Sequence, residues 1–182
     1  MNVVEYLLEK SKTIDKTAIY QGKTETSYPE LCKRVRAVSA YLHSARTSDN
    51  VLLISDNSAF CVESYLGTMG AGKVSVPIHP KTSDENIKFI IESCKIKTAF
   101  IQKRYVERFA DFIPGQLENI VVDEPVESCT AQSSLPSSTR PFADVPDMLN
   151  QLKRFCVQRL FLEVSVLIIL NRQSKAIFQM EK

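Results

Sequence analysis

Four short apolar runs, separated from one another by helical patterns, constrain the fold of this chain most strongly. They occupy residues 51–54, 74–76, 98–101 and 120–122. Each run is only long enough for a strand, and a continuous apolar run is typical of a strand buried on both faces. Strands that alternate with helices in this way form a parallel sheet between helical layers. The sequence therefore predicts an α/β fold with a doubly wound, mostly parallel sheet, flavodoxin-like or Rossmann-like in character.

Capping signals mark where the helices begin. Ser27 and Glu30 form an S-x-x-E capping box before a helical pattern that runs to about residue 44. Asn57 or Ser58 is expected to cap the next helix, which ends at the glycines of residues 70–72. A second capping box at residues 82–85 is expected to open another helix. The remaining expected elements are a helix at 2–10, a hairpin at 18–26 and a helix at 105–112.

Composition divides the chain into three parts. Residues 1–122 carry the α/β pattern, whereas Pro, Ser, Thr, Asp and Glu dominate residues 123–146. This composition lacks apolar periodicity and predicts a polar linker or a long surface loop. Residues 147–182 form a divergent tail, in which 148–162 favours a helix and 164–170 a strand.

Charge, cysteine content and hydropathy exclude several classes of protein. The chain has 23 Lys and Arg against 21 Asp and Glu, which gives a net charge of +2. This balance argues against a nucleic-acid partner, because nucleic-acid binders concentrate basic charge. Its five cysteines are widely spaced without a C-x-x-C pair, which favours a reducing, cytoplasmic setting without a zinc site. The N-terminus lacks the pattern of a signal peptide, and the longest apolar stretch, 164–170, is too short to span a bilayer. We therefore expect a cytoplasmic protein with no membrane span and no nucleic-acid partner.

Residues 67–73, Gly-Thr-Met-Gly-Ala-Gly-Lys, fit the first seven positions of a phosphate-binding loop. Two features argue against that role. Val74 stands where the motif needs a Mg²⁺-binding hydroxyl, and these glycines follow a helix instead of preceding one. We interpret them as a helix C-cap with close packing of the helix on the sheet.

Other catalytic and metal-binding patterns are absent from the sequence. His43 and His79 are the two histidines, and neither has a second ligand at metal-binding spacing. The nucleophile motif G-x-S-x-G does not occur. The residues therefore predict no catalytic, cofactor-binding or metal-binding site in this chain.

The order of local sequences is similar to that of the adenylate-forming superfamily, the AMP-dependent acyl-CoA synthetases and ligases. Residues 26–31 resemble its T-Y-x-E-L segment, and residues 55–60 resemble its N-s-x-e-f turn. Residues 65–80 resemble its stretch l-G-x-x-x-A-G-x-v-x-v-P-l-x-P. The resemblance covers about residues 2–122, and the matching positions are scaffold positions: Asn57, Gly72, Pro77 and Pro80.

This resemblance implies a chemistry in which ATP and Mg²⁺ convert a carboxylic acid into an acyl-adenylate. Coenzyme A or a carrier protein then accepts the acyl group. It also implies a Gly-rich loop for the ATP phosphates, after a strand that follows a polar linker. The last glycine here is Gly115, so no such loop follows residues 164–170 and no catalytic residue of the family is carried over. We expect a chain truncated before the ATP-binding loop, inactive alone and without a cofactor of its own.

Two other hypotheses stand beside this one. The chain could be a stand-alone α/β binding or interaction module without catalysis. It could also be an unrelated flavodoxin-like or nucleotide-binding domain.

Overall fold

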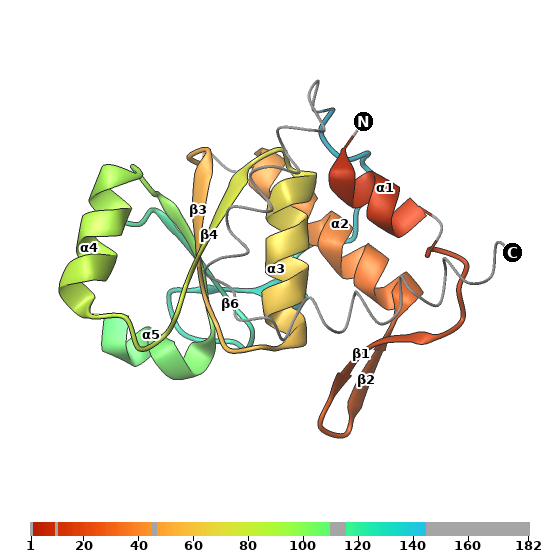
Figure 1. Ribbon diagram of the computed structural model, residues 1–182, viewed down its shortest axis with the longest axis horizontal. Coiled ribbons are helices and arrows are strands. Elements are labelled where there is room, and N and C mark those ends of the chain that lie inside the picture. The colour runs from red at the N-terminus through yellow and green to blue at the C-terminus, as the bar shows by residue number, and fades with distance from the viewer. Residues whose placement is uncertain (1, 10, 45–46, 110–115, 145–182) are drawn as a thin grey trace, which may run out of the picture.

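The computed structural model describes residues 2–9, 11–44, 47–109 and 116–144 (Figure 1). Its centre is a parallel sheet with the strand order β4-β3-β5-β6-β7. The predicted parallel sheet is therefore confirmed, whereas the helix and strand expected at 148–162 and 164–170 lie outside the described residues. The strands are β3 (Asn50–Ile54), β4 (Val74–Ile78), β5 (Thr98–Ile101), β6 (Asn119–Val122) and β7 (Thr130–Ala131).

Helices cover both faces of this sheet, as the doubly wound prediction requires. Counted within the sheet, the strand order is 2-1-3-4-5, the order of flavodoxin-like sheets. The helices α1, α2 and α3 lie on one side of the strands, and α4 and α5 on the other (Figure 1). They span Val3–Glu9, Tyr28–Ser44, Ala59–Gly70, Asp84–Ser93 and Lys103–Phe109, in that order.

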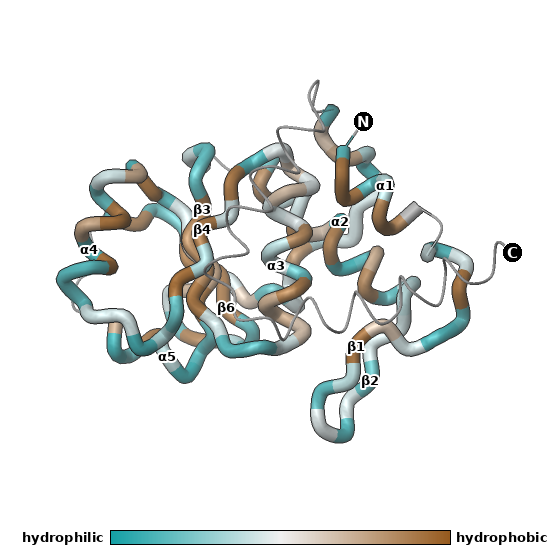
Figure 2. Tube along the Cα trace, viewed as in Figure 1, coloured by the Kyte–Doolittle hydropathy of each residue, from teal (hydrophilic) through white to brown (hydrophobic). Residues whose placement is uncertain are grey.

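The core has two layers because successive strand residues point to opposite faces. Leu53 packs in the cluster on the α2 and α3 side, whereas its neighbour Leu52 packs in the cluster on the α4 and α5 side. Both are almost completely buried, and the hydrophobic colour follows the strands through the middle of the molecule (Figure 2). This two-sided burial explains why the strands appear in the sequence as continuous apolar runs.

Two of the three helix starts follow the capping predictions. The Ser27 hydroxyl accepts a hydrogen bond from the Glu30 amide at 3.3 Å, and the Ser58 hydroxyl accepts one from the Cys61 amide at 3.1 Å. The capping box predicted at residues 82–85 is wrong, because α4 begins after Ser83 without a side-chain cap. Asp84 instead binds Arg108 of α5, with 2.7 Å between Oδ1 and Nη2.

The hairpin and the edge strand add two local details. Strands β1 (Thr17–Gln21) and β2 (Thr24–Ser27) pair around Gly22, which adopts a φ of +61°. The hairpin was predicted at this place. Strand β4 was expected to stop before Pro77, but it continues to Ile78. Proline is tolerated there because β4 lies at the edge of the sheet, where its missing N–H breaks no pairing.

The segment from 123 to 144 differs from the polar linker or surface loop that its composition suggests. It adds strand β7 beside β6 and a short 3-10 helix, η1 (Gln132–Ser134). Its Phe142 is only 6% exposed and joins the core on the α2 and α3 side. The Ala143 amide also donates to the Gly70 carbonyl at 2.9 Å. A few apolar residues therefore anchor a segment whose overall composition is polar.

Two glycines of α3 allow other parts of the chain to approach it closely. A β-carbon at Gly67 would lie 2.4 Å from Cγ1 of Val38 on α2, and one at Gly70 would lie 2.6 Å from Cδ1 of Phe142. The close packing predicted for the glycine-rich stretch is therefore present. The partners of these two glycines are α2 and Phe142, and not the sheet as we expected.

We predict that Gly67→Ala destabilises the fold, because its methyl group must displace Val38. The expected loss in the free energy of unfolding is about 1–3 kcal/mol, measured by urea denaturation. In a double-mutant cycle, Val38→Ala should offset part of this loss by making room for the new methyl group. Losses that simply add in the double variant would contradict the close contact.

Candidate functional site

The strand connections diverge between β3 and β5, the place where doubly wound proteins usually bind ligands. In this chain the side chains at the ends of these strands bind one another. The Asp56 amide donates to Oε1 of Gln102 at 3.1 Å, and the Tyr105 hydroxyl donates to Oδ1 of Asp56 at 2.8 Å. The hydroxyls of Ser55 and Ser58 lie 3.1 Å apart. The crevice between the two strand ends is thus bridged by the chain's own polar groups.

The N-terminus of α3 opens at the same edge of the sheet. Free backbone amides at such a position would favour a phosphate group. Here the Ala59 amide donates to Oε1 of Gln21, from the hairpin, at 2.8 Å. The amides of Cys61 and Val62 donate to the hydroxyl and the carbonyl of Ser58, at 3.1 and 3.2 Å. These three amides are therefore already engaged within the chain.

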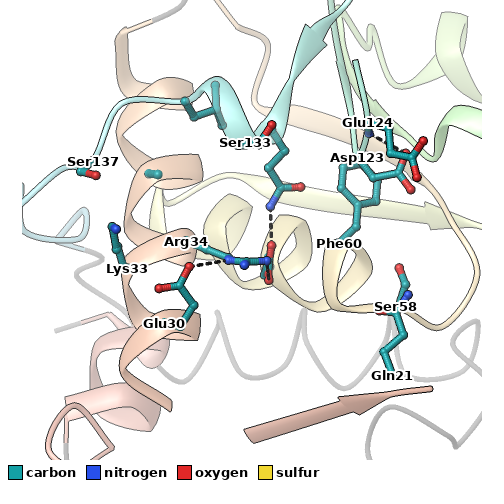
Figure 3. A pocket seen from close by; sticks show the side chains of 14 residues that line it. Gln21, Glu30, Lys33, Arg34, Ser58, Phe60, Asp123, Glu124, Ser133 and Ser137 are labelled. Atoms are coloured by element: carbon teal, nitrogen blue, oxygen red, sulfur yellow. Dashed lines mark hydrogen bonds and ion pairs between the residues drawn. The ribbon is translucent and has the colours of Figure 1, made fainter. Parts of the chain in front are cut away.

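A cavity of about 430 Å³ lies next to this helix start, between α2, α3, the end of β6 and the segment that contains η1 (Figure 3). Phe60 lines it together with several serine and glutamine side chains. Its charged lining residues comprise four acids and two bases. They are Glu30, Lys33, Arg34, Glu63, Asp123 and Glu124.

Glu63 is the buried member of this group, with 3% of its surface exposed. Nη1 of Arg34 donates to its Oε1 at 3.2 Å, and Nε2 of Gln132 donates to its Oε2 at 2.8 Å. Arg34 is shared, because its Nε also donates to Oε1 of Glu30 at 2.9 Å. Burial is the largest influence and raises the pKa of Glu63 to about 7, against the opposing effect of Arg34.

Glu63 was not among the site residues expected from the sequence. The available signal was a charged residue on a helix whose neighbours are apolar, in the stretch Phe60-Cys61-Val62-Glu63-Ser64. A carboxylate on such a helix faces either solvent or a specific partner. Which of these holds depends on Arg34 and Gln132, which lie 29 and 69 residues away in the sequence.

The glycine-rich stretch ends α3 as a Schellman motif. The Gly72 amide donates to the Met69 carbonyl at 2.9 Å, the Lys73 amide donates to the Thr68 carbonyl at 3.1 Å, and Gly72 has a φ of +73°. Nζ of Lys73 donates to the carbonyls of Thr47 and Ser48, at 3.3 and 3.0 Å. The C-cap interpretation is confirmed, and the lysine binds a neighbouring loop.

The two histidines lie apart from the cavity lining. Nδ1 of His79 accepts a hydrogen bond from the Lys81 amide at 3.1 Å, within a turn. His43 is half-buried in the last turn of α2, and this burial is the main cause that lowers its pKa. Among the described residues, no three His, Cys, Asp or Glu side chains are grouped so that they could hold a metal ion.

None of the helices in the described part of the chain is both long enough and apolar enough to cross a membrane.

Comparison with known sequences gives a family match. The pattern of the AMP-binding enzyme family matches residues 9–153. The 4-coumarate--CoA ligase 3 of Arabidopsis thaliana is 28% identical over 152 residues, which cover 79% of this chain and 27% of the ligase. Surfactin synthase subunit 2 of Bacillus subtilis is 32% identical over 120 residues, which cover 64% of this chain and 3% of the synthase. The chain therefore spans a small part of the length of these relatives.

Solved structures show the same fold. An anthranilate CoA ligase in complex with anthranoyl-AMP superposes with a TM-score of 0.67 at 21% identity, over 79% of this chain and 30% of that one. A benzoate CoA ligase from Burkholderia xenovorans gives 0.67 at 18% identity, over 81% of this chain and 31% of that one. At these identities the likeness concerns the fold alone.

We predict that Lys73→Ala leaves ATP binding unchanged, because Nζ already binds two carbonyl oxygens. Titration calorimetry should give the same heats for the variant and the unmodified chain. Stability should fall by about 1 kcal/mol from the lost hydrogen bonds. Lys81→Ala, at an exposed position, is the matched control. An ATP affinity that Lys73→Ala removes and Lys81→Ala retains would contradict this assignment.

Proposed function

This chain belongs to the AMP-binding enzyme family. On that premise we propose that it forms part of the N-terminal scaffold of an adenylate-forming acid ligase and has no catalytic residues of its own. The proposal rests on the structural roles of residues 65–80, the stretch that resembles the family motif. Its glycines are occupied by packing against Val38 and Phe142 and by the helix C-cap. These roles position α3 and β4 and support a scaffold role for the stretch.

The proposed reaction of the whole enzyme has two steps. The carboxylate of an acid attacks the α-phosphorus of ATP, which forms an acyl-adenylate and releases pyrophosphate. The thiol of coenzyme A or of a carrier protein then attacks the acyl carbon and releases AMP. Both steps require preorganised positive charge or N–H donors where negative charge develops.

Two observations on the cavity and on the start of α3 bear on where such a set could lie. The cavity lining has more acids than bases, so its field opposes a polyanion. Three amides in the first turn of α3 are already engaged with Gln21 and Ser58. Both observations support a structural role for this chain, with ATP, Mg²⁺, the acid and the acyl acceptor bound elsewhere in the enzyme. A cytoplasmic location and the absence of a nucleic-acid partner remain part of the proposal.

The proposal also concerns the division of the chain. We place the α/β unit at residues 1–122 and a separate tail at residues 147–182. The intervening residues 123–146 join the two. Their described part packs on the α/β unit through β7 and Phe142, and the family match continues through them to residue 153.

The alternative is a binding module of the same fold that performs no catalysis. The cavity of about 430 Å³ favours it, because a scaffold has no need of a polar hollow at the ligand-binding edge of its sheet. An affinity for a small acid or amine without ATP turnover would select this alternative.

We predict that the purified chain does not catalyse pyrophosphate exchange into ATP with short, long or aromatic carboxylic acids. Loss of one preorganised donor typically lowers the rate about a hundredfold or more, so loss of the whole set should reach background. An intact acid ligase is the positive control. Exchange above a no-protein blank, abolished by a substitution in this chain, would show that the chain is itself an enzyme.

A further inference from the structure

Glu63 has no part in the proposed function, yet it is the most deeply buried acid of the cavity lining. Burying a carboxylate costs free energy unless a cation and hydrogen-bond donors compensate it fully. Here the compensation is partial. Its cationic partner, Arg34, has a side chain that is 47% exposed, and Arg34 binds Glu30 at a shorter distance than Glu63.

The contacts of Glu63 join three separate elements. The residue itself belongs to α3, Arg34 comes from α2, and Gln132 comes from η1. The Ser64 hydroxyl lies 3.5 Å from Oε1 of Gln132 and adds a second link between α3 and η1. These side-chain bonds hold η1 against the two helices at the wall of the cavity. Figure 3 shows Arg34 at this wall, joined to Glu30.

Other charged groups face the same cavity. On α2 they are Glu30 and Lys33, and after β6 they are Asp123 and Glu124. Glu124 is bound by Nζ of Lys103 at 2.9 Å, and its side chain is 66% exposed. Burial is the largest influence on the pKa of Glu63, and repulsion from Glu30 acts in the same direction. Arg34 and the hydrogen bond from Gln132 oppose both.

We propose that Glu63 is a proton-operated latch that holds residues 130–135 against α2 and α3 and so closes one wall of the cavity. A proton from solvent binds a carboxylate oxygen of Glu63 and leaves a neutral carboxyl group that remains buried. Its O–H donates to the amide oxygen of Gln132 once that amide has rotated, and the amide NH₂ then faces the Ser64 hydroxyl. Loss of the proton leaves a carboxylate that gains hydration when η1 moves away.

The direction of the pH dependence follows from linkage. With η1 docked, burial holds the pKa of Glu63 near 7, above its ordinary value of 4.5. Undocking exposes the carboxyl group to water and returns its pKa toward that ordinary value. The docked state therefore binds the proton more tightly, and docking weakens as the pH rises from about 4.5 to about 7. The two pKa values set an upper limit of about 300-fold on this change in the docking equilibrium.

The latch acts beside other anchors of the same segment. Strand β7 pairs with β6 at Thr130 and Ala131, and Leu135 packs against the core. Opening is therefore a local movement of η1 and its neighbours, while the rest of the sheet stays folded.

A tryptophan at residue 133 tests the latch, because the chain contains no Trp of its own. Ser133 lines the cavity and is exposed, so Ser133→Trp places a single reporter on η1. We expect acrylamide quenching of its fluorescence, in the full chain, to increase as the pH rises, with a midpoint between about pH 4.5 and about pH 7. Glu63→Gln in this background should abolish the transition, whereas Glu124→Gln, an exposed acid of the same cavity, should retain it. A transition that persists in Glu63→Gln, or no transition in the parent, would overturn the proposal.

Hydrogen exchange on the unmodified chain keeps the proposal testable if Glu63→Gln fails to fold. The Leu135 amide donates to the Gln132 carbonyl at 3.1 Å and so reports on η1. After correction for intrinsic rates, its protection should fall as the pH rises from about 4.5 to about 7, within the upper limit of about 300-fold. Amides of β5 should keep their protection over this range. Equal behaviour of Leu135 and β5 would refute a local latch.

Discussion

The close approach of α3 to α2 at Gly67 is the contact on which the rest of this structure depends. Gly67 contributes no side chain to this contact, and the side chain of Val38 from α2 occupies the space where its β-carbon would stand. This approach leaves the next glycine along the helix, Gly70, open to the ring of Phe142. The side-chain amide of Asn2 then donates to the carbonyls of Met69, Gly70 and Ala143, at 3.0 to 3.2 Å. One small-residue face of α3 thus joins the start of the described chain to its end.

That packing explains why a glycine-rich stretch that resembles a phosphate-binding loop has a different role. In a phosphate-binding loop the glycines free backbone amides for a ligand. Here Gly67 and Gly70 allow close packing, and Gly72 permits the left-handed turn that ends α3. The lysine that follows binds the carbonyls of a neighbouring loop. The same residue types serve opposite purposes, because Gly67 and Gly70 lie within α3 and Gly72 lies just after it.

The cavity beside α3 arises from the same arrangement. Residues 130–135 are held over α2 and α3 by pairing with β6 on one side and by Gln132 and Glu63 on the other. A buried acid at this junction connects the protonation state of one side chain to the position of one wall. The chemistry of this cavity depends on the side chains of Glu63, Arg34 and Gln132.

Local signals in the sequence predicted most of the strands and helix ends. Two-sided burial gives continuous apolar runs, so β3, β5 and β6 were predictable. Hydrogen bonds within one turn gave the helix starts at Ser27 and Ser58, and the position of its glycines after a helix gave the end of α3. The tertiary structure alone decided what depends on residues distant in sequence. Strand β7 exists only through its pairing with β6, and Asp84 binds Arg108 of another helix. Glu63 acquires its role from Gln132, 69 residues away. A local pattern cannot report such contacts, because the folded chain brings their partners together only after every intervening element has been placed.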